Sequence, residues 1–332
     1  MRRYLSSLAL SMAMAGMALV QPAAAQSAAQ PFKVVAFAGS SNLPIWLGQI
    51  QGIFAKRGLN VTVDITPNSV EMARNLEAQK YELALTSIDN IVAYDEGQGE
   101  AGLGKVDFVA LFGVDDGMLS LIVAKSVPSI QAIKGQKVAV DAATTGFAFV
   151  LRAMLSHAGV TDYSFVKVGG GAQRLAALLD GSQTITLLNT PLDIAAEAHG
   201  FKSLGRASDI IGPYQGIVAA VKRDRVAPDR AQLVAFARGF HESVMYLMDP
   251  AHRAQAIGLL KTRMKMSDAD AARAYAALVD KRHGIFRSGR VSVAGVKTVL
   301  KLRTQYAEPH KELHAPAYYI DDSIRKVALA KK

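Results

Sequence analysis

Residues 32–42 read Phe32-Lys33-Val34-Val35-Ala36-Phe37-Ala38-Gly39-Ser40-Ser41-Asn42. The first six positions predict a buried β-strand, and the glycine and small polar residues after them predict a turn into a helix. The expected helix carries Trp46, Ile50, Ile53 and Phe54 on one face and ends at Gly58, where a glycine can take left-handed backbone angles. The stretch therefore indicates one strand followed by one helix.

The same unit recurs along the chain to about residue 200. Further strands are predicted at 61–65, 83–85, 137–140, 163–168 and 184–188, each followed by small polar or glycine residues and an apolar helix face. Strands alternating with helices of about 10–15 residues indicate mainly parallel sheets flanked by helices. After residue 220 the pattern becomes helical, with starts expected at Pro228-Asp229 and Ser267. We therefore predict an α/β fold with a helical C-terminal third.

This topology gathers polar residues at one edge of each sheet. The carboxyl ends of parallel strands meet at the same edge, and ligands of open α/β sheets bind there. Any single residue after a strand is explained equally well as a helix cap, which stabilises a helix by about 1 kcal/mol. Taken together, the residues at this edge are the candidates for a binding site.

Residues 1–25 have the layout of a secretory signal peptide. Arg2 and Arg3 form a basic start, residues 8–20 are apolar, and residues 23–25 are three alanines. The apolar run is shorter than the roughly 20 residues that span a bilayer. We predict cleavage after Ala25 and a soluble periplasmic protein.

Composition excludes several kinds of site. The chain contains no cysteine, so disulfides, thiolate metal sites and a cysteine nucleophile are excluded. Its net charge of +10 comes from basic residues spread singly along the sequence, without basic runs or interleaved aromatic residues. This distribution is typical of a solvated basic surface, and no nucleic-acid partner is predicted.

No catalytic set emerges from the motifs. Glycines 169–171 are not followed by Gly-Lys-Ser/Thr, and no Gly-x-Ser-x-Gly occurs. His310 and His314 are four apart, but their order differs from the zinc motif His-Glu-x-x-His and prolines crowd the segment. Asp115-Asp116 is open to three interpretations: an acid/base pair, a turn, or a contact to a ligand's amine or hydroxyl. Binding without chemistry is therefore favoured over an enzyme, with no cofactor and no metal.

Several segments, in this order and spacing, carry a family resemblance. They are Leu43-Pro44-Ile45-Trp46, Gly52 to Leu59, Ile133 to Val140, Thr144-Thr145-Gly146, Leu151 to Gly159, Leu178-Leu179-Asp180-Gly181 and Asn189-Thr190-Pro191. Over residues 32–320 the chain resembles the periplasmic substrate-binding proteins of nitrate/sulfonate/taurine-type ABC importers. These proteins share a fold with thiamine-pyrimidine synthase.

The resemblance implies a two-lobed type II periplasmic binding protein fold. Lobe one would comprise residues 32–122 and 217–332, and lobe two residues 123–216, with hinge strands at 119–124 and 216–221. The protein would capture a small organic or oxyanionic solute by lobe closure. It would then deliver the solute, as a monomer, to ABC permease subunits in the inner membrane.

The resemblance also implies the ligand-binding residues by position. One side of the cleft would comprise Ser40, Ser41, Asn42, Trp46, Thr86 and Ser87. The other side would comprise Thr144, Thr145, Gly146, Asn189 and Thr190. Tyr214 would lie near the hinge, and Asp115 is included as a possible ligand contact. The Trp46 ring would either stack on the ligand or pack in the buried face of its helix.

The ligand class stays open at this level. Hydroxyls and N–H groups at helix starts favour an oxyanion or a polar head group. Carboxylates near the strand ends (Asp89, Asp115, Asp116 and Asp141) outnumber arginines there, which leaves room for a zwitterion, a neutral heterocycle or an aromatic acid. Alternative roles are a periplasmic sensor, another importer class, an enzyme of the thiamine-pyrimidine synthase superfamily, or a hydrolase. The synthase family depends on a cysteine-rich stretch, which this chain lacks.

Overall fold

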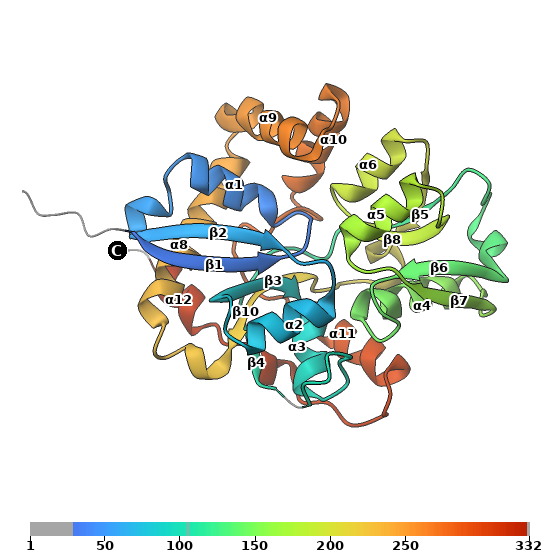
Figure 1. Cartoon of the computed structure of the whole chain (residues 1–332), viewed down its shortest axis with the longest axis horizontal. Helices are drawn as coiled ribbons and strands as arrows, with labels where there is room; N and C mark the ends of the chain where they lie inside the picture. Colours follow the sequence, from blue (N-terminus) through green and yellow to red (C-terminus); the bar gives the residue numbers. More distant parts are fainter. Residues whose placement is uncertain (1–28, 105, 331–332) are drawn as a thin grey trace, which may run out of the picture.

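Two five-stranded sheets lie side by side and are flanked by helices (Figure 1). The computed structural model describes residues 29–104 and 106–330, so the predicted signal peptide lies outside the described residues. Within these ranges, no helix is both long and apolar enough to cross a membrane. The predicted alternation of strands and helices is confirmed.

The first sheet has the strand order β2-β1-β3-β10-β4. Its strands are β1 (Gln30–Ala36), β2 (Leu59–Ile65), β3 (Leu83–Ser87), β4 (Phe108–Gly113) and β10 (Ile217–Lys222). The helices between them are α1 (Asn42–Ile50), α2 (Ser69–Glu77) and α3 (Ile88–Asp95). β10 runs antiparallel to both of its neighbours, and the other strands share one direction.

The second sheet repeats this plan with the order β7-β6-β8-β5-β9. Its strands are β5 (Leu119–Val123), β6 (Gln136–Val140), β7 (Tyr163–Lys167), β8 (Ile185–Asn189) and β9 (Lys202–Arg206). The helices are α4 (Gly146–His157), α5 (Gly171–Leu179), α6 (Leu192–Ala198) and α7 (Ser208–Ile211). β5 is the reversed strand here. The chain passes between the sheets at residues 114–118 and again at residues 207–216.

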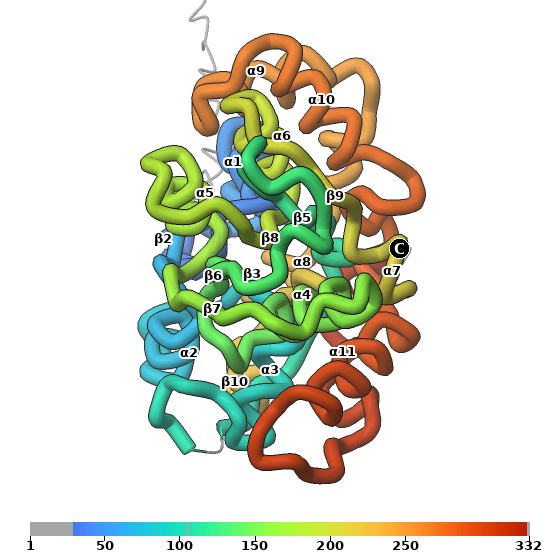
Figure 2. The backbone as a smooth tube through the Cα atoms, turned by 90° about the vertical axis from the view of Figure 1, so that its right-hand side faces the viewer, coloured from blue at the N-terminus to red at the C-terminus, as the bar shows by residue number. Residues whose placement is uncertain are grey.

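The C-terminal third is helical, as predicted. It contains α8 (Arg230–Met248), α9 (Arg253–Met264), α10 (Asp268–Leu278), α11 (Val293–Tyr306) and α12 (Ser323–Leu329). α8 packs against α1 and α12, and Phe236 on α8 stacks on Phe32 of β1 at 4.8 Å between ring centroids. α10 contacts α6, and α11 contacts α3 and α4, so this third touches helices of both sheets. Figure 2 shows α10 near the top of the molecule and α11 in its lower half.

Two local predictions were wrong. The first helix ends at Ile50 rather than at Gly58, because Gly52 takes a positive φ of 64° and turns the chain. Ile50 consequently stays exposed, whereas Ile53 and Phe54 are buried from the turn that follows. The sequence Asn189-Thr190-Pro191 also favours proline at the first helical position of the next helix, whereas Pro191 occupies the N-cap of α6.

Candidate binding cavity between the two sheets

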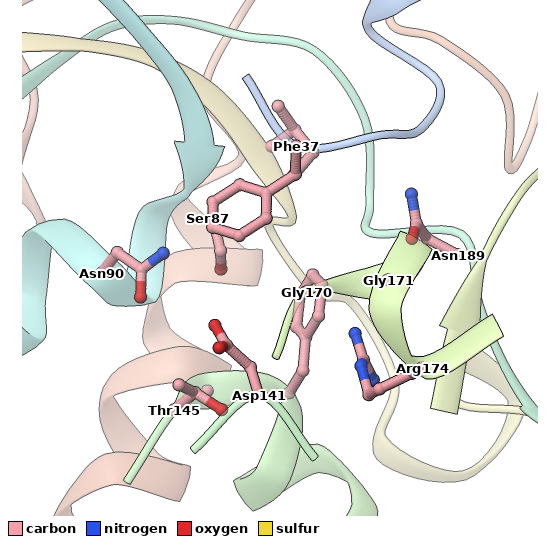
Figure 3. A pocket seen from close by; sticks show the side chains of 12 residues that line it. Phe37, Ser87, Asn90, Asp141, Thr145, Gly170, Gly171, Arg174 and Asn189 are labelled. Carbon is pink, nitrogen blue, oxygen red and sulfur yellow. The ribbon is translucent and has the colours of Figure 1, made fainter. Parts of the chain in front are cut away.

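A cavity lies where the strand ends of the two sheets face each other (Figure 3). It encloses about 480 Å³, counting the solvent at its mouth. Its lining comprises Phe37, Ser87, Asn90, Asp141, Thr145, Gly146, Phe147, Gly170, Gly171, Arg174, Asn189 and Ile217. These residues come from the ends of β1, β3, β6, β7 and β8, the start of β10, and the first turns of α3, α4 and α5.

Direct contacts join the two sheets around this cavity. The Gly170 N–H donates to the Pro67 carbonyl at 2.7 Å, and the Asn189 amide donates to the Ala38 carbonyl at 3.4 Å. At the rim, Glu100 accepts hydrogen bonds from the Thr144 hydroxyl at 2.6 Å and the Lys167 ammonium at 2.8 Å. The cavity is therefore bounded by residues of both sheets that already touch.

Asp141 brings a carboxylate into the lining. It follows β6 directly and is 9% exposed. Its Oδ2 accepts a hydrogen bond from the backbone N–H of Ser69, the first residue of α2, at 3.0 Å. Its Oδ1 is buried and has no hydrogen-bond partner among the described residues. Burial raises the pKa of Asp141, and the hydrogen bond from Ser69 and the charge of Arg174 oppose that shift.

Arg174 brings a buried guanidinium to the same wall. It is 4% exposed, and its Nε donates to the Gly169 carbonyl at 3.1 Å. Its Nη1 donates to the Leu187 carbonyl and, at 3.5 Å, to the Thr186 hydroxyl. Burial lowers the pKa of Arg174 to about 10, and the negative charge of Asp141 acts in the opposite direction. The guanidinium is thus held in place by neutral oxygen acceptors.

Four of the residues predicted from the sequence line the cavity: Ser87, Thr145, Gly146 and Asn189. Ser87 is the N-cap of α3, where its hydroxyl accepts the Asp89 N–H at 3.3 Å. Thr145 occupies the N-cap position of α4, but its hydroxyl donates to the Ala142 carbonyl at 2.9 Å and caps no helical N–H. Capping therefore does not account for the hydroxyl of Thr145.

The first helix places its predicted residues outside the lining. The Ser40 hydroxyl donates to Asp115, and Ser41 is the N-cap of α1 without a side-chain cap bond. The Asn42 side chain accepts the Gly39 N–H at 2.7 Å. Trp46 is half-buried, packs against the core, and has the Arg263 guanidinium 5.7 Å from its ring centroid.

The remaining predicted residues lie around the cavity rather than on its wall. Thr86 accepts the amide of Asn90 at 2.8 Å. Thr144 bonds Glu100 at the rim, as described above, and Thr190 donates to Asp193 at 3.1 Å. Tyr214 is buried with its ring centroid 6.5 Å from that of Phe147. None of these four side chains belongs to the lining of the cavity.

The lining residues missed from the sequence are of two kinds. Asp141 and the glycine pair 170–171 follow predicted strands, so the strand-edge rule pointed to their place. Phe37, Phe147 and Ile217 are apolar residues of a predicted strand, helix and hinge strand, and no signal in the sequence singled out Asn90 or Arg174 as a site residue. No pattern in the sequence distinguishes a buried arginine from an exposed one.

A buried ion pair lies directly behind the cavity. Arg303 of α11 is fully buried and forms a bidentate pair with Asp89 of α3, with Nε to Oδ1 at 2.8 Å. Its Nη2 also donates to the Thr144 carbonyl at 3.0 Å, and its guanidinium lies 5.0 Å from the ring centroid of Phe149. One side chain of the C-terminal third therefore ties α3 to the segment before α4.

Asp115 ties the crossing between the sheets to the loop before α1. It is fully buried, and its Oδ1 accepts the N–H groups of Gly117 at 2.8 Å and Ile217 at 3.1 Å. Its Oδ2 accepts the Ser40 hydroxyl. Burial raises its pKa from 3.8 to about 6, although these hydrogen bonds act in the opposite direction.

Because the folded state disfavours ionised Asp115, this group should make the protein less stable as the pH rises from about 4 to about 6. Asp115→Asn keeps the acceptor for the two N–H groups and cannot ionise. The variant should therefore gain stability relative to the natural protein across this window, with no further gain above about pH 7. Urea unfolding at half-unit pH steps measures the difference. A difference that is constant from pH 4 to 7 would contradict the shifted pKa.

The described residues contain no group of three or more histidine, aspartate or glutamate side chains able to hold a metal ion. His314, one of the paired histidines of the sequence, instead contacts Glu96 through Nδ1 at 2.6 Å. It thereby ties the C-terminal segment to the end of α3.

Two mixed sheets flanked by helices, with a cavity between their strand ends, define the fold of the type II periplasmic binding proteins. The family model described as NMT1/THI5 like matches residues 40–254, more than half of the chain. The chain belongs to the NMT1/THI5-like family.

Solved structures share this fold at low sequence identity. The periplasmic nitrate-binding protein NrtA from Synechocystis PCC 6803 is 13% identical, with a TM-score of 0.74 over 91% of this chain and 88% of that chain. A ligand-binding component of an ABC-type import system from Staphylococcus aureus, with zinc bound, is 13% identical, with a TM-score of 0.71 over 90% and 99%. The alkanesulfonate-binding protein SsuA from Xanthomonas axonopodis pv. citri, bound to MOPS, is 13% identical, with a TM-score of 0.68 over 88% and 98%. No curated protein sequence matches the chain.

Proposed function

We propose that the protein captures a small solute outside the cytoplasm and delivers it to an ABC import permease. The observation that carries this proposal is the cavity between the two sheets, lined by strand ends and helix starts from both. The named neighbours bind nitrate or alkanesulfonate, or serve ABC-type import, and these roles support the class of function. The protein acts as a binding protein and not as an enzyme.

Capture proceeds by closure of two lobes around the connections between the sheets. We place the first connection at residues 114–118, slightly before the predicted boundary, because β5 pairs only with β8 and β9. The second connection is residues 207–216. Lobe two then extends from β5 to α7, and the remaining described residues form lobe one. The contacts across the cavity, such as Gly170 to Pro67, belong to the closed form.

The site residues in this proposal are those that line the cavity. Ser87, Thr145, Gly146 and Asn189 contact the solute, together with Asp141 and Arg174. The aromatic side chains of Phe37 and Phe147 cover its apolar part. The predicted signal peptide accounts for export to the periplasm, where the protein meets the permease as a monomer.

The proposal is tested by thermal-shift and native mass spectrometry screens of the purified protein, followed by small-angle scattering. The panel contains amines, amidines, aromatic acids, sulfonates and nitrate. A ligand that binds only the native state raises the melting temperature, by mass action. We expect one solute per chain, no chemical change in the solute, and a smaller radius of gyration at saturation. Turnover of a bound solute would contradict a binding role, and an unchanged radius would contradict lobe closure.

A further inference from the structure

We propose that Asp141 selects a ligand that carries a hydrogen-bond donor, and that the same carboxylate couples this contact to lobe closure. The ligand class is an amine, an amidine or an amino-substituted ring. This inference rests on the proposed function, because it assigns a role within the same cavity.

The first observation is the unused oxygen of Asp141. The carboxylate is 9% exposed, lines the cavity, and points between Asn90 and Thr145 (Figure 3). Its Oδ1 is buried and accepts no hydrogen bond from any described residue. A buried carboxylate oxygen without a partner costs free energy, which a donor on the ligand would recover.

The second observation is that several donors on the wall hydrogen-bond to groups other than Asp141. The Asn90 amide donates to Thr86, the Asn189 amide donates to Ala38, and the Thr145 hydroxyl donates to Ala142. Arg174 directs Nε and Nη1 to backbone carbonyls and Thr186 instead of to the carboxylate. None of these hydrogen bonds is directed to Asp141, so Oδ1 stays available for a donor on the ligand.

The rest of the lining limits the shape of that ligand. Phe37, Phe147 and Ile217 supply apolar surface to the lining. The aromatic rings of Phe37 and Phe147 favour a ligand with a flat apolar part, on which they can stack. A compact ring with one donor group at its end satisfies both the apolar wall and the carboxylate.

The third observation links this contact to closure. The Oδ2 of Asp141 accepts the N–H of Ser69 at 3.0 Å, so the carboxylate of one lobe holds the N-terminus of α2 in the other. The other side of Ser69 is fixed as well, because its carbonyl accepts the Tyr94 hydroxyl at 3.2 Å. A ligand donor on Oδ1 orients the carboxylate for α2 and so favours the closed form.

The experiment uses small probes of opposite hydrogen-bonding character, measured by calorimetry on the full chain; benzamidine and benzoate are the pair matched in shape. The donor probes are benzamidine and 2-aminopyridine, and the acceptor-only probes are benzoate and nitrate. The natural protein should bind benzamidine at least about 10-fold more tightly than benzoate. Asp141→Asn keeps an acceptor for Ser69 and presents an amide N–H to the ligand. It should weaken benzamidine binding by about 10- to 100-fold and abolish the preference over benzoate.

Two further variants separate selection from folding. Asp162→Asn removes a carboxylate from an exposed position in the same lobe and should leave both affinities unchanged. Ser69→Pro removes the N–H that reaches Asp141, at a first helical position that accepts proline. It should weaken both probes by a similar factor and keep their ratio, since it affects closure only.

The outcomes distinguish this inference from the proposed function, solute capture, on which it rests. Equal binding of benzamidine and benzoate to the natural protein, unchanged in Asp141→Asn, would overturn the role of Asp141 and leave solute capture standing. Binding of none of the four probes, by either protein, would overturn both the donor preference and its basis in this cavity. Loss of ligand preference in Ser69→Pro would overturn the assignment of separate roles to the two oxygens.

Discussion

Replacing Arg303 with methionine should lower the free energy of unfolding by about 3–5 kcal/mol. The substitution leaves Asp89 as a buried carboxylate without its partner, because both side chains are 1% exposed or less. It also removes the donor that reaches the Thr144 carbonyl. In a chain of this size the loss corresponds to a melting temperature lower by about 10 °C. Differential scanning calorimetry and urea unfolding measure both quantities.

A double variant tests whether the unpaired charge is the cause. With Asp89→Asn added to Arg303→Met, neither member of this pair is charged. More than half of the lost stability should then return. Lys261→Met is the control, because it breaks an exposed pair with Asp268 and should change stability by less than about 1 kcal/mol. A loss of the same small size in Arg303→Met would contradict the cost assigned to the buried pair.

Gly146→Ala should reduce ligand affinity by about 5- to 150-fold. A Cβ at this position would lie 2.4 Å from Cβ and Cγ of Asp89, closer than real side-chain atoms approach. Gly146 begins α4, which flanks the second sheet, and Asp89 lies in the first turn of α3, which flanks the first sheet. Overpacking of this kind costs about 1–3 kcal/mol, and that free energy sets the expected loss. In the proposed mechanism the cost falls on the closed form alone.

The measurement compares affinity with ligand-free stability. Titration calorimetry should show the weaker binding, while the ligand-free melting temperature stays within a few degrees. Gly258→Ala is the matched control, since a Cβ there meets nothing within 4 Å on the helix α9. An unchanged affinity in Gly146→Ala would show that α3 and α4 separate or shift without consequence for binding.

The sequence predicts the sheets and helices well because their signals are local. Apolar runs such as residues 32–37 and 137–140, and caps such as Ser267, act through neighbours in the chain. Ser267 does accept the Asp270 N–H at 3.1 Å. The turn at Gly52 was missed because the helical spacing of Ile53 and Phe54 continued beyond the point where the backbone turns away.

The site was predictable only where it coincides with strand ends and helix starts. Thr145 is found by that rule, whereas Gly146 is named only through the family resemblance. Arg174 and Arg303 are not, because their burial depends on carbonyls and carboxylates more than ten residues away in sequence. Asp141 stands at a predicted strand end, yet only the packed structure reveals that one of its oxygens has no partner.

The position of β10 determines the order in which the two sheets can form while the chain is being synthesised. All strands of the second sheet lie between Leu119 and Arg206, so that sheet can form as one continuous segment. The first sheet needs β10, which inserts between β3 and β4. Until Lys222 has emerged, β3 and β4 each expose an unpaired edge. A nascent chain therefore holds a finished second sheet beside an incomplete first one, and that interval is when it most needs protection from aggregation.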